Sequence, residues 1–324
     1  MNPIKIKPID ELMGQYYPEQ EYIVDRLIPD ASITILSGTS RSFKTYTLLE
    51  IALSVAKGEP LFGQFETLHG GVLVIDEENG ERLLQKRLYQ LGATADLPIY
   101  FTALQGFRLE DRHIDEALMA CAERGIKLVI IDALIRIHDA DENSAREMSK
   151  VFRKLRRFTE SDIAVLVTQH NRKQGTVHGG SGNEMRGSSD ILAAIDSHIG
   201  VIRKDKWYLY FDQTKQRYDV ELDPFEVKVS VDDMSFRFEY LGAVRSSIDK
   251  SEILRTAVVQ LLNEHKQLRQ KDLLEKLANL DIKTNEHTLR GLLGRWVAEG
   301  LLAPPLAGAG NTKLYTLKDG ASNE

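Results

Sequence analysis

The sequence predicts an α/β protein in which a mostly parallel sheet carries an antiparallel extension and is followed by a small helical domain. Short β-branched runs alternate with helical patterns between residues 33 and 167, which is typical of a parallel sheet with helices on both faces. Short alternating runs between residues 198 and 240 favour antiparallel hairpins that extend the sheet. Three helical segments follow residue 248.

The composition is that of a globular protein with room for two domains. The chain has 324 residues, of which 42% are hydrophobic and 28% are charged. The net charge of −6 argues against a generally basic nucleic-acid coat, although it leaves room for a local basic channel. The single cysteine, Cys121, excludes an internal disulfide and fits a reducing compartment.

Neither a secretory signal nor a membrane span is expected. The N-terminus lacks an apolar signal core. The longest apolar run, from Leu128 to Ile131, is interrupted by Asp132 and is too short to cross a bilayer. We therefore expect a cytoplasmic protein.

Local patterns predict the elements of a first domain, residues 1–243. Residues 1–30 are expected to form a lead-in that packs on the first strand. Apolar, β-branched runs predict strands at residues 33–37, 72–75, 99–102, 128–131 and 163–167. Apolar residues at helical spacing predict helices at residues 48–55, 81–91, 115–124 and 144–158. Period-two alternation predicts antiparallel strands at residues 207–211, 225–229 and 236–240.

A second domain is predicted at residues 248–320. Its helices are expected at residues 249–264, 270–280 and 285–299, and the third has a regular apolar stripe. Residues 301–302, a Pro-Gly loop and residues 313–317 then predict a β-wing, which together with the helices makes a winged helix-turn-helix. Its candidate contacts to DNA are Lys283, Arg290, Arg295 and the wing near Lys313. These charges are equally typical of a solvated face, and many winged helices bind protein.

Residues 38–45 match a phosphate-binding loop between a strand and a helix. The loop consists of Gly38, Thr39, Ser40, Arg41, Ser42, Phe43, Lys44 and Thr45. In such a loop, backbone N–H groups and the helix N-terminus face the phosphates, Lys44 reaches the β/γ oxygens and Thr45 holds Mg²⁺. Phe43 stands where the motif has glycine, and this bulky residue narrows the conformations available to the loop. The alternative is an ordinary strand–turn–helix with a surface lysine.

Acidic residues end two of the predicted strands. Asp132 follows the strand at residues 128–131, where a carboxylate opposite the phosphate-binding loop is expected to orient the water shell of Mg²⁺. Asp76, Glu77 and Glu78 end the strand at residues 72–75, and ATP hydrolysis needs a base there that polarises water. The alternatives are a turn capped by Asp132 and a solvated acidic turn at residues 76–78.

A polar run follows the strand at residues 163–167. Gln169 or His170 is placed to hydrogen-bond the γ-phosphate and to report its presence to the next loop. That loop, residues 174–185, is glycine-rich, and the candidates for contact with a nucleic-acid backbone in or beside it are Lys173, His178 and Asn183. No cysteine or acidic spacing supports a metal site at the two histidines.

Lys215 and Arg217 lie at the end of a strand in the predicted extension. Cations spaced by two residues project to the same side of a strand. The pair is therefore either an exposed basic edge, which is common, or an arginine finger supplied to the ATP of a neighbouring subunit.

Together these segments resemble the RecA-like hexameric P-loop ATPases and helicases, in particular the plasmid RepA-type group with its AAA-type relatives, and more distantly DnaB. The resemblance covers residues 18–240. Lys44 and Thr45 match the Walker A residues, and Ile131-Asp132 looks like Walker B. Residues 74–78 followed by Arg87 are similar to the family's strand–glutamate segment, and that spacing favours Glu78 over Glu77 as the catalytic residue.

The resemblance continues through residues 169–217. Residues 169–173 are similar to the family's His-His-x-x-Lys segment, with Gln169 in place of the first histidine. Arg186-Gly-Ser-Ser189 with Asp196 matches a further family segment, and this adds Arg186 to the candidates for DNA contact. Lys215-x-Arg217 looks like the finger of DnaB-type rings.

The resemblance implies a homo-hexameric motor on single-stranded DNA that depends on ATP and Mg²⁺, such as the replicative helicase of a plasmid, phage or integrated element. ATP would lie between subunits, and the C-terminal domain would bind duplex DNA or a replication protein. No membrane partner is expected. One alternative is a nucleotide-switched DNA-binding regulator, helicase loader or recombination mediator. Another is a ring that binds nucleotide only for assembly.

Overall fold

The computed structural model describes residues 6–170, 188–244, 250–280, 282, 284–307 and 313–318. The chain divides into two compact units, Met1–Val244 and Arg245–Glu324, and each is described by itself. Among the described residues, no helix has both the length and the apolar character needed to cross a membrane.

Within the described residues, nine strands form the central sheet of the first unit in the order β11-β10-β9-β8-β3-β7-β6-β4-β5. The strands are β3 (Ile33–Gly38), β4 (Gly71–Asp76), β5 (Ile99–Ala103), β6 (Ile126–Asp132), β7 (Ala164–His170), β8 (Ser197–Arg203), β9 (Tyr208–Gln216), β10 (Phe225–Val231) and β11 (Phe236–Ala243). The strands from β8 to β5 are parallel, and β9, β10 and β11 extend the sheet in antiparallel pairs. This mostly parallel α/β sheet fits a RecA-like P-loop core.

The central strands are buried on both faces, which explains their nearly continuous apolar sequences. In β3, Ile33 and Ile35 belong to one apolar cluster and Leu36 belongs to the cluster on the opposite face. Val165 and Leu166 of β7 divide between the two clusters in the same way. Two separate cores therefore sandwich the sheet.

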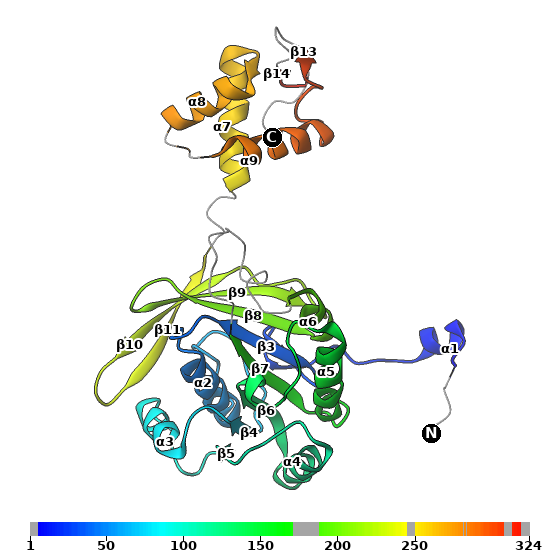
Figure 1. The fold of residues 1–324 in the computed structure, drawn as a ribbon, viewed down its shortest axis with the longest axis vertical. Helices are drawn as coiled ribbons and strands as arrows, with labels where there is room; N and C mark the ends of the chain where they lie inside the picture. The colour runs from blue at the N-terminus through cyan, green and yellow to red at the C-terminus, as the bar shows by residue number, and fades with distance from the viewer. Residues whose placement is uncertain are drawn as a thin grey trace. The chain divides into compact units, whose positions relative to one another are not determined.

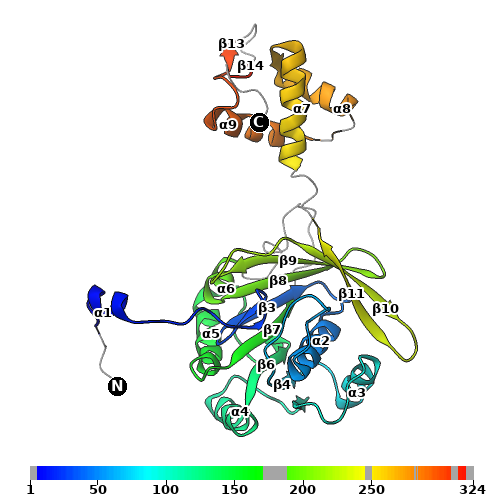
Figure 2. The same cartoon turned by 180° about the vertical axis from the view of Figure 1, so that it is seen from behind.

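Helices cover both faces of the sheet, as Figures 1 and 2 show from opposite sides. The helices are α2 (Lys44–Lys57), α3 (Glu81–Gln90), α4 (Asp111–Arg124), α5 (Ala145–Thr159) and α6 (Ser188–Ala194), with a short 3₁₀ turn at Leu134–Arg136. Helix α2 buries Leu48, Ile51 and Val55 in one core. Helices α4, α5 and α6 pack into the other core, where Cys121 of α4 is buried.

The lead-in to the first strand is only partly packed. Strands β1 (Tyr22–Val24) and β2 (Ile28–Pro29) pair with each other and place Ile23 and Ile28 in the core. The preceding helix, α1 (Ile9–Gly14), has no buried residue. Against the expectation that residues 1–30 pack on the first strand, the large apolar side chains of residues 6–17 are exposed in the part of the chain that the structure describes.

The second unit has three helices and a small sheet among its described residues. The elements are α7 (Lys250–His265), β12 (Leu268–Arg269), α8 (Gln270–Asn279), α9 (Glu286–Ala298), β13 (Leu306–Ala307) and β14 (Lys313–Tyr315), and the strand order is β12-β14-β13. Leu289, Leu293 and Trp296 of α9 are buried in its core, as their helical spacing predicts. The two-residue strand β12 is too short to leave a sequence pattern.

Candidate nucleotide-binding site

The phosphate-binding loop links β3 to α2 at the carboxyl edge of the parallel strands. β3 ends at Gly38, and α2 begins at Lys44. Gly38 cannot carry a side chain, because a Cβ atom there would lie 2.6 Å from the carbonyl oxygen of Val201. The Nζ atom of buried Lys44 donates to the carbonyl oxygens of Gly38 at 3.0 Å and Thr39 at 2.9 Å. The loop is therefore wrapped around the lysine that the motif requires.

Burial lowers the pKa of Lys44, while the carboxylates of Asp132 and Glu78 act in the opposite direction. A cation that has already lost most of its water is well placed to interact strongly with phosphate oxygens. Lys44 is thus poised for an anionic ligand.

Thr45 and Asp132 meet beside the loop, as the sequence predicts for a magnesium site. The hydroxyl of Thr45 donates to Oδ2 of Asp132 at 2.8 Å, and the hydroxyl of Thr168 donates to Oδ1 at 2.5 Å. Hydroxyl and carboxylate oxygens are ligands that Mg²⁺ accepts, usually with several waters and phosphate oxygens completing the shell. The hydroxyl of Thr45 and the carboxylate of Asp132 therefore fit Mg²⁺ that arrives with a nucleotide.

The two glutamates after β4 face different surroundings. The carboxylate of Glu77 accepts from the backbone N–H groups of Gln105, Gly106 and Phe107 at 2.9–3.2 Å. Glu78 instead lines the pocket next to the phosphate-binding loop. Glu77 is therefore occupied in holding a loop, and Glu78 is the carboxylate that faces the site.

Asp76, at the end of β4, holds the turn that carries Glu78. Its Oδ1 atom accepts from the backbone N–H groups of Glu78 at 2.9 Å and Asn79 at 2.7 Å, which fixes the turn that carries Glu78. Burial, and then the neighbouring charge of Asp132, raises the pKa of Asp76 to about 6. The sequence analysis favoured Glu78 among the three acids but did not predict this supporting role for Asp76.

His170 lies where Lys44 and Glu78 approach each other. Its Nδ1 atom is 3.4 Å from Nζ of Lys44, and its Nε2 atom is 3.8 Å from Oε2 of Glu78. The preceding residue, Gln169, is buried. Because β7 pairs with β3 so that His170 lies opposite Gly38, His170 lies beside the start of the phosphate-binding loop.

Lys44, Thr45, Glu78, Asp132 and His170 line one pocket of ≈ 460 Å³. Its lining side chains are Ser40, Arg41, Ser42, Phe43, Lys44, Thr45, Tyr46, Glu78, Asn79, Arg87, Asp132, His170 and Arg203. Sequence reasoning missed the contribution of Tyr46, Asn79 and Arg203. Arg203 ends β8, whose pairing with β3 is visible only in the folded sheet.

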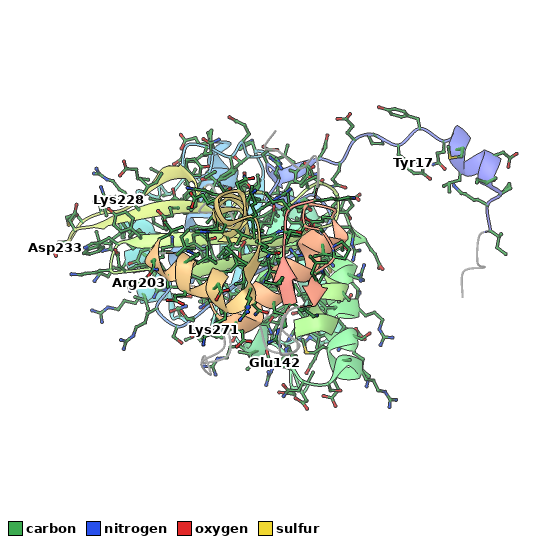
Figure 3. The ribbon with its side chains drawn as sticks, turned by 90° about the horizontal axis from the view of Figure 1, so that it is seen from above. Tyr17, Glu142, Arg203, Lys228, Asp233 and Lys271 are labelled. Atoms are coloured by element: carbon green, nitrogen blue, oxygen red, sulfur yellow. The ribbon has the colours of Figure 1, made fainter. Side chains whose placement is uncertain are left out.

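Phe43 adopts a backbone conformation that usually belongs to glycine. Its φ of 57° and ψ of 24° lie in the left-handed region, which is unfavourable for residues with a Cβ. Its ring packs edge-on against Phe236 and Tyr46, and the guanidinium of Arg203 lies 4.5 Å from its ring centre. The aromatic side chain thus ties the phosphate-binding loop to β11 of the antiparallel extension. Figure 3 labels Arg203 at the end of β8, together with Lys228 of β10 and Asp233 in the turn that follows β10.

Lys215 and Arg217 do not line this pocket. Lys215 lies opposite His198 near the start of the parallel strand β8, so both cations lie at the sheet edge opposite the phosphate-binding loop. Arg217 forms an ion pair with Asp196 at 2.9 Å, and Nζ of Lys215 donates to the carbonyl oxygen of Leu192. A role in this chain's own nucleotide site is therefore excluded in this conformation, whereas the finger for a neighbouring subunit stays a prediction.

The remaining candidates lie elsewhere. Lys173, His178, Asn183, Arg186 and Lys283 fall outside the described residues. Arg290 and Arg295 are exposed on α9, and Arg290 is paired with Glu286 at 2.7 Å. Lys313, in β14, is also exposed. No contact with nucleic acid follows from exposure alone.

The sheet, the loop around Lys44 and the Thr45–Asp132 pair together define a P-loop nucleotide-binding protein. Comparison with protein families agrees with this class, because residues 2–176 match the model of the AAA domain. The chain therefore belongs to the AAA domain family of P-loop ATPases. Members of this family bind nucleotide, usually with Mg²⁺, and hydrolyse it.

Proposed function

We propose that this protein is an ATP-driven, ring-forming motor on single-stranded DNA and acts as a replicative helicase of a plasmid, phage or integrated element. One observation carries the proposal: His170 contacts both Lys44 and Glu78 and is the residue from which residues 171–187 continue. A change at the γ-phosphate would therefore reach that segment directly. The segment contains Arg172, Lys173 and Arg186, and such cations suit a nucleic-acid backbone.

The C-terminal unit supports the proposal as a candidate winged helix-turn-helix. Its order is helix, strand, helix, helix and two strands, with β12 pairing alongside β14 and β13. In this arrangement α9 would be the recognition helix, with Arg290 and Arg295 as candidate contacts to duplex DNA. A replication protein is the other candidate partner for this unit.

A second candidate is a nucleotide-switched regulator, helicase loader or recombination mediator. The observation that favours it is Phe43, whose left-handed backbone and packed ring restrain a loop that glycine would leave mobile. A restrained loop suits a protein that holds nucleotide longer than a fast motor does.

Strand displacement distinguishes the two candidates. We expect the purified protein with Mg²⁺ and ATP to unwind a forked DNA duplex and to hydrolyse ATP faster when single-stranded DNA is present. Lys44→Ala and Asp132→Ala should each lower turnover at least ~100-fold while the protein stays folded, because one removes charge at the transferred phosphate and the other removes a metal anchor. Hydrolysis stimulated by DNA without unwinding would favour the regulator. Full turnover in Lys44→Ala would remove the site assignment.

A further inference from the structure

Helix α5 is strongly basic on its outer side. Its 15 residues include six arginines and lysines but one glutamate. Arg146, Lys150, Arg153 and Arg157 follow one another at steps of four, three and four residues, so they form one line along the helix. We call this line the basic row. The large apolar side chains of α5 are buried on its other side, so the basic row faces away from the core.

Three members of the basic row have no partner of opposite charge. Arg157, at the end of the row, pairs with Asp111 and Asp115 of α4. The other three members are exposed, and neither an ion pair nor a side-chain hydrogen bond joins them to another described residue. Their charges are therefore available to a partner outside the unit.

Acidic side chains lie beside the basic row and limit where it is positive. Glu110, Asp139 and Glu147 line a hollow of ≈ 420 Å³ that four cations, two of them from the row, also line. Asp139 pairs with Arg108 at 3.1 Å, and the carboxylate of Glu147 accepts from the backbone N–H of Asp141 at 2.6 Å. The remaining acids at the ends of the helix are Asp141, Glu142 and Glu160. Because the cations of α5 outnumber the acids of the hollow, the row keeps a positive charge.

The spacing of the basic row suits a chain of phosphates. A helix rises 1.5 Å per residue, which places neighbouring members of the row about 4–6 Å apart along the axis. The charges thus form a line and not a single pocket. Proteins that bind single strands follow the phosphate backbone with such a line of cations.

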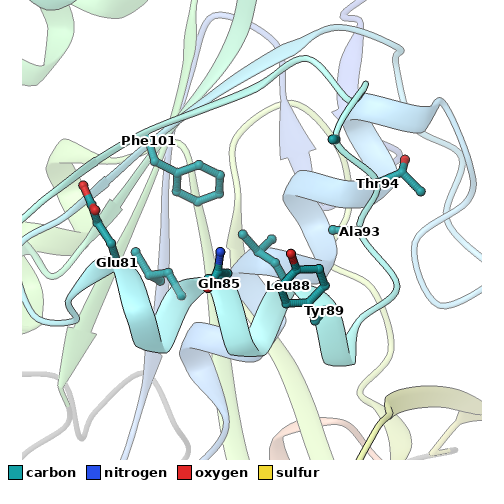
Figure 4. Close-up of a pocket in the computed structure, with 9 residues that line it drawn as sticks. Glu81, Gln85, Leu88, Tyr89, Ala93, Thr94 and Phe101 are labelled. Atoms are coloured by element: carbon teal, nitrogen blue, oxygen red, sulfur yellow. The ribbon is translucent and has the colours of Figure 1, made fainter.

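The composition of α5 distinguishes a nucleic acid from a membrane or a protein partner. Both of these usually require apolar anchors beside the charge, and the large apolar residues of α5 are all buried. Helix α3 differs in this respect. Its Arg82 and Lys86 are exposed and four residues apart, but Figure 4 shows Glu81 and Tyr89 of the same helix in a groove with Phe101. Charge alone is what α5 offers.

Helix α5 also lies next to the element that follows residues 171–187. The guanidinium of Arg156 donates to the carbonyl oxygen of Ala194 in α6 at 3.0 Å, and the two helices lie side by side in Figures 1 and 2. Helix α6 is the first described element after residues 171–187. The basic row thus belongs to the helix packed against the end of the segment that leaves His170.

We propose that the basic row of α5 binds the phosphate backbone of single-stranded DNA. The inference rests on the proposed motor and assigns it a binding surface on a helix, in addition to residues 171–187. The contact is electrostatic and independent of base sequence, because the row has cations and no exposed aromatic ring.

The salt dependence of DNA binding tests the row. The variant combines Arg146→Gln, Lys150→Gln and Arg153→Gln, and a labelled thymidine oligonucleotide is titrated with Mg²⁺ and a non-hydrolysable ATP analogue present. Each phosphate contact on a single strand contributes about 0.7 to the slope of log affinity against log salt, so the slope should become shallower by about 2. At about 0.1 M salt the affinity should fall at least tenfold. An unchanged slope would overturn the proposal.

The matched control removes the same charges elsewhere. Arg82→Gln, Lys86→Gln and Arg237→Gln change two arginines and one lysine that are exposed outside the row, and this variant should keep the slope of the wild type. An equal fall in both variants would reflect net charge alone and would contradict the assignment. If the row variant melts well below the wild type, Lys150→Gln alone should still make the slope shallower by about 0.7.

A conservative variant and two further ligands identify the contact. Arg146→Lys with Arg153→Lys keeps both charges and should keep the slope, because a phosphate backbone accepts either cation. Loss of the slope in this variant would contradict a purely electrostatic contact. A larger effect of the row on duplex than on single-stranded DNA would overturn the single-strand assignment. A poly-glutamate peptide that depends on the row as strongly as DNA does would reassign the row to an acidic protein.

Strand displacement by the wild type separates this inference from the proposed function. If the wild type does not unwind DNA but its binding depends on the row, the motor is removed and the surface is kept. If the wild type unwinds DNA and the row variant keeps its salt slope, the surface is removed and the motor is kept.

Discussion

The ring of Phe43 lies edge-on to the ring of Phe236, with 5.3 Å between ring centroids and 70° between ring planes. Phe43 belongs to the phosphate-binding loop, and Phe236 begins β11, the outer strand of the antiparallel extension. The extension therefore reaches the nucleotide site through an aromatic contact. Such pairs are worth about 0.5–1.5 kcal/mol beyond the area they bury.

Substitutions at Phe43 should separate the backbone effect from the ring effect. Phe43→Gly loses the ring and accepts the left-handed φ of 57°, whereas Phe43→Ala loses the ring and keeps the backbone strain. We expect Phe43→Ala to raise the KM for ATP more than Phe43→Gly does, with a difference of about threefold to tenfold. Equal KM values in the two variants would show that the backbone strain does not affect binding.

The matched control for the ring contact is on β11. Phe236→Leu should also raise the KM for ATP, while Phe238→Leu should not, because Phe238 packs on Phe236 and Phe62 rather than on Phe43. Melting curves of both variants show whether stability rather than the contact is affected. A KM change of the same size in both variants would contradict a specific contact between Phe236 and the loop.

Glu77 and Glu78 should give different phenotypes. Glu78→Gln keeps the shape of the side chain and loses the basic carboxylate, so ATP should bind while turnover falls about 10²–10⁴-fold. Glu77→Gln should keep turnover and lower the free energy of unfolding by about 1–3 kcal/mol, because an amide cannot accept from all three N–H groups of residues 105–107. Kinetics together with urea denaturation measures both. Exchanged phenotypes would make Glu77 the catalytic base.

His198 makes stability depend on pH. It is fully buried between the hydroxyls of Ser37 and Thr214, and burial lowers its pKa to about 4. Because the folded protein binds this proton less readily than the unfolded chain, the neutral imidazole supports stability above pH 6.5, and that support is lost as pH falls from 6.5 to 4. The loss is about 2 kcal/mol by pH 5.

The measurement compares wild type with His198→Gln by urea denaturation at pH 7.5 and pH 5. The comparison is needed because burial raises the pKa of Asp76 to about 6 and that of Glu50 to about 7. These two carboxyls stabilise the folded protein as pH falls, which is opposite to the effect of His198. Both proteins share those carboxyls, so the stability difference between them should narrow at pH 5. A difference independent of pH would mean that His198 titrates normally.

Local sequence was sufficient to predict the parts of the site that lie within one strand and its following loop. Gly38 to Thr45 and Asp132 each follow a β-branched run, and parallel strands bring their carboxyl ends to one edge. The alternation of strands and helices predicted the mostly parallel sheet for the same reason. These features depend on neighbours in the sequence.

The parts that sequence did not predict depend on contacts between distant segments. Arg203 reaches Phe43 only because β8 pairs with β3. The task of Glu77 depends on a loop that begins after β5. The left-handed backbone of Phe43 is held by packing against β11, whose pairing cannot be read from periodicity. The contact of Arg203, the hydrogen bonds of Glu77 and the backbone conformation of Phe43 all depend on tertiary packing.

The last prediction concerns Arg217, which pairs with buried Asp196 and whose guanidinium also donates to the carbonyl oxygens of Ala193 and Ile195. The carboxylate of Asp196 accepts in turn from the backbone N–H of Ile33 at the start of β3. Arg217 thus has a structural task in its own chain. Whether it also serves a neighbour's ATP is tested by mixing variants, with Arg217→Gln used so that Asp196 keeps a hydrogen-bond donor.

Lys44→Ala chains lack a working phosphate-binding loop, and Arg217→Gln chains lack the finger. If the finger acts in trans, a mixture of the two should recover ATP turnover that neither has alone, because some interfaces pair an intact loop with an intact finger. A supplied arginine is worth about 10³–10⁵-fold in rate in well-studied phosphoryl transfer, so the recovered signal should be clear. Subunit exchange is checked with labelled chains. No recovery after confirmed exchange would leave Arg217 as a structural partner of Asp196 only. The candidates for the arginine that acts on ATP would then be Arg41, Arg87 and Arg203, which line the pocket within the same chain.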